Sequence, residues 1–223
     1  MSRSAFDIIG PAMIGPSSSH TAGAVRIGLI ARHLLGAAPK HAKVELHGSF
    51  ASTGIGHATD RAIVAGLLGW APDDPRLKES LETAANEGLD VLFAAVDLGE
   101  TIHPNTARIL LSAGSHRSLS LIASSVGGGS VEIFGVDDYS VRFSAELPTV
   151  AIWHDDRPGF LAHVTAIFAC VDANIATIQT ARRHRAAEAL TIVELDLQPL
   201  AAATDLLRCI GHVRRLESLP PLS

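Results

Sequence analysis

The chain has 223 residues, of which 47% are hydrophobic and 18% are charged, and a formal net charge of −5. This length suffices for two domains with hydrophobic cores, while the absence of a basic stripe argues against binding the phosphates of nucleic acids. The first residues lack the apolar core of a signal peptide, and no run approaches the roughly 20 apolar residues that cross a bilayer, so we expect a cytoplasmic protein without membrane contact.

The first part of the chain predicts both helices and strands. Helices are predicted over 21–36, 57–69 and 76–87, where apolar residues recur at helical spacing and a glycine ends each run. Strands are predicted over 42–50, 89–96, 107–112, 118–125, 130–134 and 141–143. Residues 1–146 should therefore form an α+β domain with a largely antiparallel sheet.

The composition shifts near 146–148, and residues 148–223 predict the order βαββαβ. Strands are expected over 148–154, 175–183, 189–197 and 213–219, the last at a sheet edge. The first helix should begin near Pro158, with Asp155 or Asp156 close to its N-cap. A second helix is expected over 201–210.

Hydroxyl side chains gather immediately before the first predicted helix. Ser17, Ser18, Ser19 and Thr21 flank His20 there, whereas an ordinary N-cap needs only one serine. Hydroxyls and free backbone N–H groups at a helix entry form a cradle for an anion. We therefore predict that Ser17–Thr21 binds a carboxylate or braces a cleft.

The run Gly48–Asp60 precedes the second predicted helix and places His57 at the helix start. A helix N-terminus lowers the basicity of an imidazole, which favours a neutral histidine able to accept a proton. Asp60, one turn later, is expected to orient that ring or to cap the helix. A His57 that merely caps a surface helix is the alternative.

A third cluster, His103-Pro104-Asn105-Thr106, enters a predicted strand. Proline keeps the residue before it extended, so the side chains of His103 and Asn105 are expected to point the same way. An imidazole beside an amide suits the orientation of a substrate. A simple turn remains the alternative.

These motifs, in this order, resemble the β domain of iron–sulfur L-serine dehydratases over most of residues 8–146. The segments that carry the resemblance are GPSSSHTAG, GSFASTGIGHATDRAIVAGLLG, HPNTARI and SVGGGSVEI. Ala58 departs from the family, which often has glycine there. The same domain is similar to the allosteric substrate-binding domain of some phosphoglycerate dehydrogenases.

The resemblance implies the conversion of L-serine to pyruvate and ammonia, with one iron of a [4Fe-4S] cluster taking the hydroxide. Such a cluster needs at least three cysteine thiolates, whereas this chain has only Cys170 and Cys209, which we expect to be buried in helices. The cluster is therefore expected on a partner α subunit, with no metal bound by this chain.

The resemblance also implies roles for the residues singled out above. His57, His103 and Asn105 are the expected catalytic residues, and the substrate-binding residues are expected to be Ser17, Ser18, Ser19, His20, Thr21 and Asp60. Which histidine acts as the base is open, and a base on the α chain is an alternative.

The second part resembles an ACT domain through its Asp156-x-Pro-Gly159 turn and its Asn174-Ile175 pair. This resemblance implies self-association and an amino-acid ligand, L-serine, held by Asp156, Gly159 and Asn174, where a helix N-terminus attracts a carboxylate. A domain that only dimerises is the alternative.

Two other classes of function stay open. A non-catalytic amino-acid sensor would use the first domain as an allosteric pocket and the ACT domain for dimerisation. A metal-dependent hydrolase using His20, His57 and His103 is the third class, which no His-Glu-x-x-His spacing supports.

Overall fold

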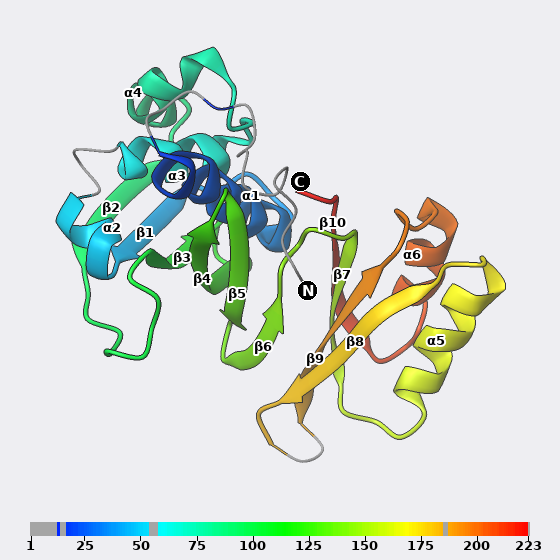
Figure 1. Cartoon of the computed structure of the whole chain (residues 1–223). Helices are drawn as coiled ribbons and strands as arrows, with labels where there is room; N and C mark the ends of the chain where they lie inside the picture. Colours follow the sequence, from blue (N-terminus) through cyan, green and yellow to red (C-terminus); the bar gives the residue numbers. More distant parts are fainter. Residues whose placement is uncertain (1–12, 14–16, 54–57, 185–186, 223) are drawn as a thin grey trace. The chain divides into compact units, whose positions relative to one another are not determined.

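The computed structural model of the chain describes residues 13, 17–53, 58–184 and 187–222 (Figure 1). The chain divides into two compact units, one ending at Asp137 and the other covering Asp138–Leu222. Each unit is described by itself. The domain boundary expected from composition at 146–148 stays a prediction.

The first unit combines short helices with five strands of a mixed sheet. Its elements are η2 (Ser18–Ala22), α1 (Gly23–Leu35), β1 (His41–Leu46), α2 (Gly48–Thr53), α3 (Thr59–Leu68), η3 (Pro75–Glu79), α4 (Ser80–Asn86), β2 (Asp90–Ala95), β3 (Thr106–Ser112), β4 (Ser118–Gly127) and β5 (Ser130–Val136). The sheet order is β2-β1-β3-β4-β5-β6, where β6 is Tyr139–Phe143. Within the described residues, β1 and β2 pair in parallel, whereas β1 with β3, β3 with β4 and β4 with β5 pair antiparallel, so the predicted α+β class is confirmed.

The predicted strand over 42–50 is too long, because β1 ends at Leu46 and α2 begins at Gly48. Gly48 has a left-handed backbone with φ of +55°. A Cβ atom at this position would lie 2.7 Å from Pro104 Cα. Only glycine tolerates both the backbone angle and this contact, and the chain therefore turns from strand to helix here.

Helices α1 and α3 pack closely because two glycines face each other. A Cβ atom on Gly28 would lie 2.3 Å from the Ile63 carbonyl oxygen, and one on Gly66 would lie 2.1 Å from the Val25 carbonyl oxygen. The two backbones thus approach more closely than any larger residue allows. This contact fixes α3 relative to α1, and two of the three motifs precede these helices in the sequence.

The second unit contains the order βαββαβ. Its elements after β6 are β7 (Thr149–Asp155), α5 (Phe160–Cys170), β8 (Ile175–Arg182), β9 (Glu188–Leu195), α6 (Ala201–Arg208) and β10 (Val213–Leu219). Their antiparallel sheet has the order β10-β7-β9-β8, which is the ferredoxin-like arrangement. The predicted fold class of this part is confirmed, including the edge position of the last strand.

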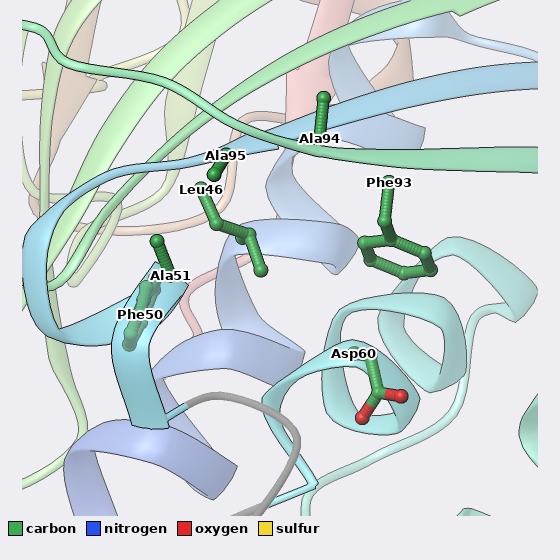
Figure 2. A pocket seen from close by; sticks show the side chains of 7 residues that line it. All are labelled: Leu46, Phe50, Ala51, Asp60, Phe93, Ala94 and Ala95. Carbon is green, nitrogen blue, oxygen red and sulfur yellow. The ribbon is translucent and has the colours of Figure 1, made fainter.

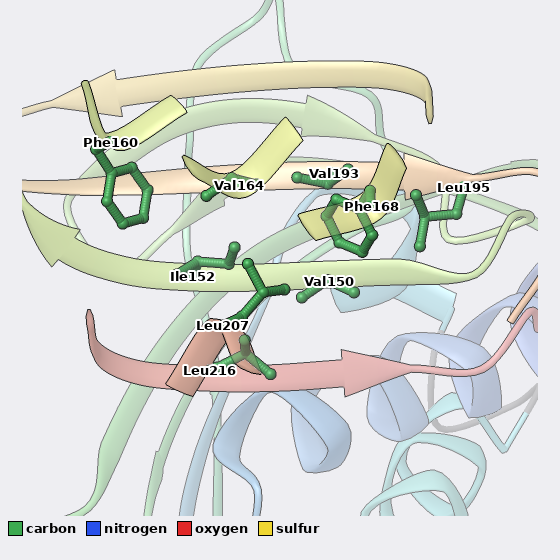
Figure 3. Packing of buried hydrophobic residues seen from close by; sticks show 9 residues of the cluster. All are labelled: Val150, Ile152, Phe160, Val164, Phe168, Val193, Leu195, Leu207 and Leu216. Carbon is green, nitrogen blue, oxygen red and sulfur yellow. The ribbon is translucent and has the colours of Figure 1, made fainter. Parts of the chain in front are cut away.

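The two helices of this unit cover one face of the sheet, where a single apolar core forms (Figure 3). Helix α5 contributes three residues that follow one another at intervals of four, Phe160, Val164 and Phe168. They pack with residues of β7, β9, β10 and α6, namely Val150, Ile152, Val193, Leu195, Leu207 and Leu216.

Two expectations for this part are wrong. Helix α5 begins at Phe160, after Gly159 with φ of +84°, and no side chain caps it, so neither aspartate is the N-cap. Both cysteines are exposed rather than buried. Cys170 lies two residues beyond the last core position of α5, and Cys209 two residues beyond buried Leu207, so each falls on another helix face.

No helix in the described ranges has the length and apolar character needed to cross a membrane.

Candidate functional site

The first motif forms a short π-helical turn that runs directly into α1. Ser17 is extended and caps this turn, because its hydroxyl oxygen accepts a hydrogen bond from the His20 backbone N–H at 3.3 Å. The Thr21 N–H donates to the Ser17 carbonyl oxygen at 2.8 Å. Single π-helical turns next to α-helices occur often at functional sites.

His20 is held between this turn and α2. Its Nε2 lies 3.2 Å from Thr53 Oγ1 and 3.3 Å from Ser49 Oγ, and its Nδ1 lies 3.4 Å from Ser17 Oγ. The Thr53 hydroxyl donates to the Ser49 carbonyl oxygen at 2.8 Å, so Thr53 Oγ1 accepts from the imidazole. The Nε2 atom of His20 therefore carries a proton. Ser49 and Thr53, one helical turn apart, were not singled out in the sequence.

His103 and Asn105 of the third motif are joined by a local hydrogen bond. The Asn105 backbone N–H donates to His103 Nδ1 at 3.1 Å. In the neutral ring, the proton therefore lies on Nε2, which acts as a donor. The Asn105 side-chain oxygen Oδ1 is buried and has no hydrogen-bond partner among the described residues.

The third motif is also fixed to α2. The Phe50 N–H donates to the Pro104 carbonyl oxygen at 3.2 Å, beside the close contact of Gly48 with Pro104. Since the same helix holds His20 through Ser49, α2 connects the first motif to the third. The structure thus brings these two predicted motifs together.

A second contact between the motifs runs through Ser125, which the sequence analysis missed. The Ser125 N–H donates to the Asn105 carbonyl oxygen at 2.9 Å, at the end of the β3–β4 ladder. The two residues stand opposite each other, so their side chains lie on the same face of the sheet. A Cβ atom on Gly23 would lie 2.0 Å from Ser125 Oγ, so the start of α1 covers this point.

His57 of the second motif lies outside the described residues, and its predicted role stays a prediction. Helix α3 follows Ala58, which has a left-handed φ of 57°. Asp60, in the first turn, lines a pocket of about 350 Å³ (Figure 2). One of its carboxylate oxygens, Oδ1, is buried without a hydrogen-bond partner in the described part of the chain.

The predicted ligand residues of the second unit are well separated on one chain. Asp156 precedes α5 and pairs with Arg182 at 3.1 Å, whereas Asn174 follows α5 and donates to Asp196 at 2.7 Å. Helix α5 has 11 residues, which corresponds to about 16 Å. Gly159, with open space around its Cα, lies on the Asp156 side. A ligand held by all three would therefore need two copies of the chain.

A buried histidine adjoins the turn that contains Asp156 and Gly159. His154 is 2% exposed and stacks on Phe160 with a ring-centroid separation of 3.6 Å. Its Nδ1 donates to the Asp155 carbonyl oxygen at 2.9 Å, and its Nε2 lies 2.9 Å from Thr191 Oγ1. Burial lowers the pKa of His154 below 6.5, although the Asp155 carbonyl oxygen and the carboxylates of Asp156 and Asp155 oppose the shift.

This pKa shift predicts that the second unit loses stability in mild acid. Below about pH 6.5 the unfolded chain protonates this histidine, whereas the folded chain keeps His154 neutral. The free energy of unfolding therefore decreases as the pH falls below about 6.5. Calorimetry measures the free energy of unfolding of the chain and of His154→Gln at several pH values. This free energy should depend less on pH in the variant. Thr191→Val, which keeps the imidazole, should retain the dependence; equal slopes for the chain and His154→Gln would contradict the assignment.

The chain was compared with protein families and with known proteins. The family model described as serine dehydratase beta chain matches residues 4–88. A probable L-serine dehydratase beta chain of Bacillus subtilis is 42% identical over 194 residues, which cover 87% of each chain. The L-serine dehydratase beta chain of Peptoniphilus asaccharolyticus is 37% identical, with 86% of this chain and 87% of that protein covered.

Two further matches cover only part of the chain. The L-serine dehydratase TdcG of Escherichia coli is 38% identical over 161 residues, which are 60% of this chain and 35% of that protein. The ACT domain from the GTP pyrophosphokinase of Chlorobium tepidum is 21% identical and covers 32% of this chain and 95% of that domain, with a TM-score of 0.28.

Proposed function

The chain belongs to the family of L-serine dehydratase β chains, and we propose that it serves as the β subunit of an enzyme converting L-serine to pyruvate and ammonia. The observation that carries this proposal is identity of 42% and 37% to two β chains over nearly their whole length. The sensor alternative is not favoured, because the matched full-length relatives are named as dehydratase chains.

We propose that a partner α subunit supplies the iron–sulfur cluster. The donor set of this chain does not fit such a cluster, because two exposed cysteines are fewer than the three thiolates required. In the parts of the chain that the structure describes, no three His, Cys, Asp or Glu side chains gather to hold a metal ion. The L-serine dehydratase TdcG matches this chain over only 35% of its own length, so most of that protein has no counterpart in this chain. This supports the proposal that a separate α subunit supplies the rest of the enzyme.

We propose that His103 orients the substrate as a hydrogen-bond donor. Its Nδ1 already accepts the Asn105 N–H, so the ring presents the proton on Nε2 to the cleft. Acceptance of a proton at Nδ1 would require that bond to break. The base that takes the α-proton of serine is therefore proposed to be His57 or a group of the α chain.

The remaining site residues are proposed to position serine. Asn105, whose side-chain oxygen has no hydrogen-bond partner among the described residues, suits the ammonium group. The turn Ser17–Thr21, braced through His20, is proposed to face the carboxylate with its hydroxyl groups. Asp60 is proposed as a further contact for the ammonium group.

The second unit is proposed to self-associate and to bind L-serine as a regulator. Asp156 and Gly159 of one copy would meet Asn174 of another, since these residues stand at opposite ends of α5. Serine that binds one state of the assembly more tightly shifts the enzyme toward that state.

Coexpression with the α chain tests the proposed function. We expect an oxygen-sensitive, iron-containing complex that forms pyruvate and ammonia from L-serine in equal amounts. The α chain alone should carry the iron, which metal analysis of each purified chain can check. Pyruvate formation by this chain alone, free of partner and iron, would overturn the proposal.

A further inference from the structure

One pocket of the first unit has a composition that does not suit serine alone. It lies at the carboxyl ends of the parallel strands β1 and β2, where Leu46 pairs with Ala95 (Figure 2). Ligands commonly bind at the carboxyl ends of parallel strands. The lining residues come from β1, α2, α3 and β2, and are Leu46, Phe50, Ala51, Asp60, Phe93, Ala94 and Ala95.

Asp60 provides the only charge in this lining. No ion pair or hydrogen bond of its carboxylate occurs within the described residues, and Oδ1 is buried there without a partner. A buried carboxylate oxygen of this kind gains most from a ligand that donates a charge-assisted hydrogen bond.

The other lining side chains are two phenylalanines, a leucine and three alanines, none of which donates a hydrogen bond. A carboxylate or phosphate would find no side-chain donor there. The hydroxymethyl group of serine would also leave most of the 350 Å³ unfilled. An ammonium group carried on a compact apolar body satisfies both the charge and the walls.

We propose that this pocket binds small primary amines, with the ammonium group on Asp60 and an apolar body of four or five carbons, roughly the size the pocket admits, against the partly exposed Phe93. The inference rests on the proposed function in one respect, namely that Asp60 also contacts the ammonium group of serine. Such amines then compete with serine for the same carboxylate.

Calorimetric titration of the full chain with isoamylamine at neutral pH tests the proposal. We expect saturable binding that is at least tenfold tighter than that of isoamyl alcohol, which has the same apolar body without the charge. Ethanolamine, which keeps the ammonium group but lacks the apolar body, should bind at least tenfold more weakly. Equal binding of the amine and the alcohol would overturn the role of Asp60.

Two variants locate the binding. Asp60→Asn should weaken isoamylamine binding at least tenfold, while Asp73→Asn, which changes an exposed carboxylate on the same unit, should leave it unaltered. Ala95→Leu keeps the charge and adds volume on the strand face that carries Phe93 and Leu46, and should also weaken binding at least tenfold. Unaltered affinity in either pocket variant would place the amine elsewhere and overturn the proposal.

The same titration on the complex with the α chain separates this inference from the proposed function. Competition between isoamylamine and serine in pyruvate formation supports the inference. Loss of amine binding only when the α chain is present would show that the partner fills the pocket, and would overturn the small-amine assignment. Failure of the isolated chain to bind the amine would overturn the inference. Pyruvate formation by the complex would still support the proposed function in that case.

Discussion

Replacing His103 by alanine is expected to lower kcat/KM for serine in the reconstituted complex by about 100-fold, the usual cost of losing one oriented hydrogen-bond donor. The His103 Nδ1 atom accepts the Asn105 N–H, so the neutral ring carries its proton on Nε2, which has no hydrogen-bond partner among the described residues. His103→Gln places an amide N–H near the position of Nε2 and should recover about tenfold of the loss. Steady-state kinetics across pH measure both effects.

The glutamine variant distinguishes orientation from proton transfer. A glutamine amide cannot act as a base, so a variant as inactive as His103→Ala would contradict the donor role. His41→Ala is a suitable control, because this histidine is exposed on β1 and, among the described residues, pairs only with exposed Asp90. We expect its kinetics to match those of the unmodified complex.

Replacing Gly23 by alanine is expected to destabilise the first unit by about 1–3 kcal/mol, the usual range for overpacking. The new Cβ would lie 2.0 Å from Ser125 Oγ and 2.7 Å from Ser125 Cβ, so α1 or β4 must move. Either shift separates the Ser17–Thr21 turn from Asn105, and turnover of the complex should fall with stability. Urea unfolding of the chain measures the first effect.

A second substitution tests whether this contact is responsible. Ser125→Gly removes both atoms that the new methyl group meets, so the double variant Gly23→Ala with Ser125→Gly should be more stable than the sum of the single changes predicts. Gly211→Ala is the control, because nothing lies within 4 Å of the added atom. Additive effects of the two changes would show that the clash is relieved elsewhere.

Hydrophobic periodicity predicted most of the fold, because helices and strands that bury one face carry that pattern in their own residues. Periodicity gave a wrong prediction where a tertiary contact determines the local structure. Val44, Leu46 and Phe50 continue an alternating pattern, yet the chain enters α2 because Gly48 meets Pro104. The exposed cysteines were misjudged for a related reason, since an apolar neighbourhood does not reveal which helix face a residue occupies.

The candidate site shows the same limit. The motifs around Ser17 and His103 were recognisable from their unusual density of polar groups. The residues that join them, Ser49, Thr53 and Ser125, are ordinary hydroxyl residues in the sequence. Their role in joining the motifs becomes visible only in the folded chain, where α2 and the end of β4 lie beside the motifs. The proposed catalytic role of His57 remains a prediction.

The buried imidazole of His154 has a practical consequence. A ring proton that is shielded from water and donated to a carbonyl oxygen exchanges slowly enough to give its own nuclear magnetic resonance signal. His154 lies two residues before Asp156 and stacks on the residue after Gly159. The chemical shift of this ring proton should therefore change when a regulatory amino acid binds at that turn, so binding can be followed without any added label.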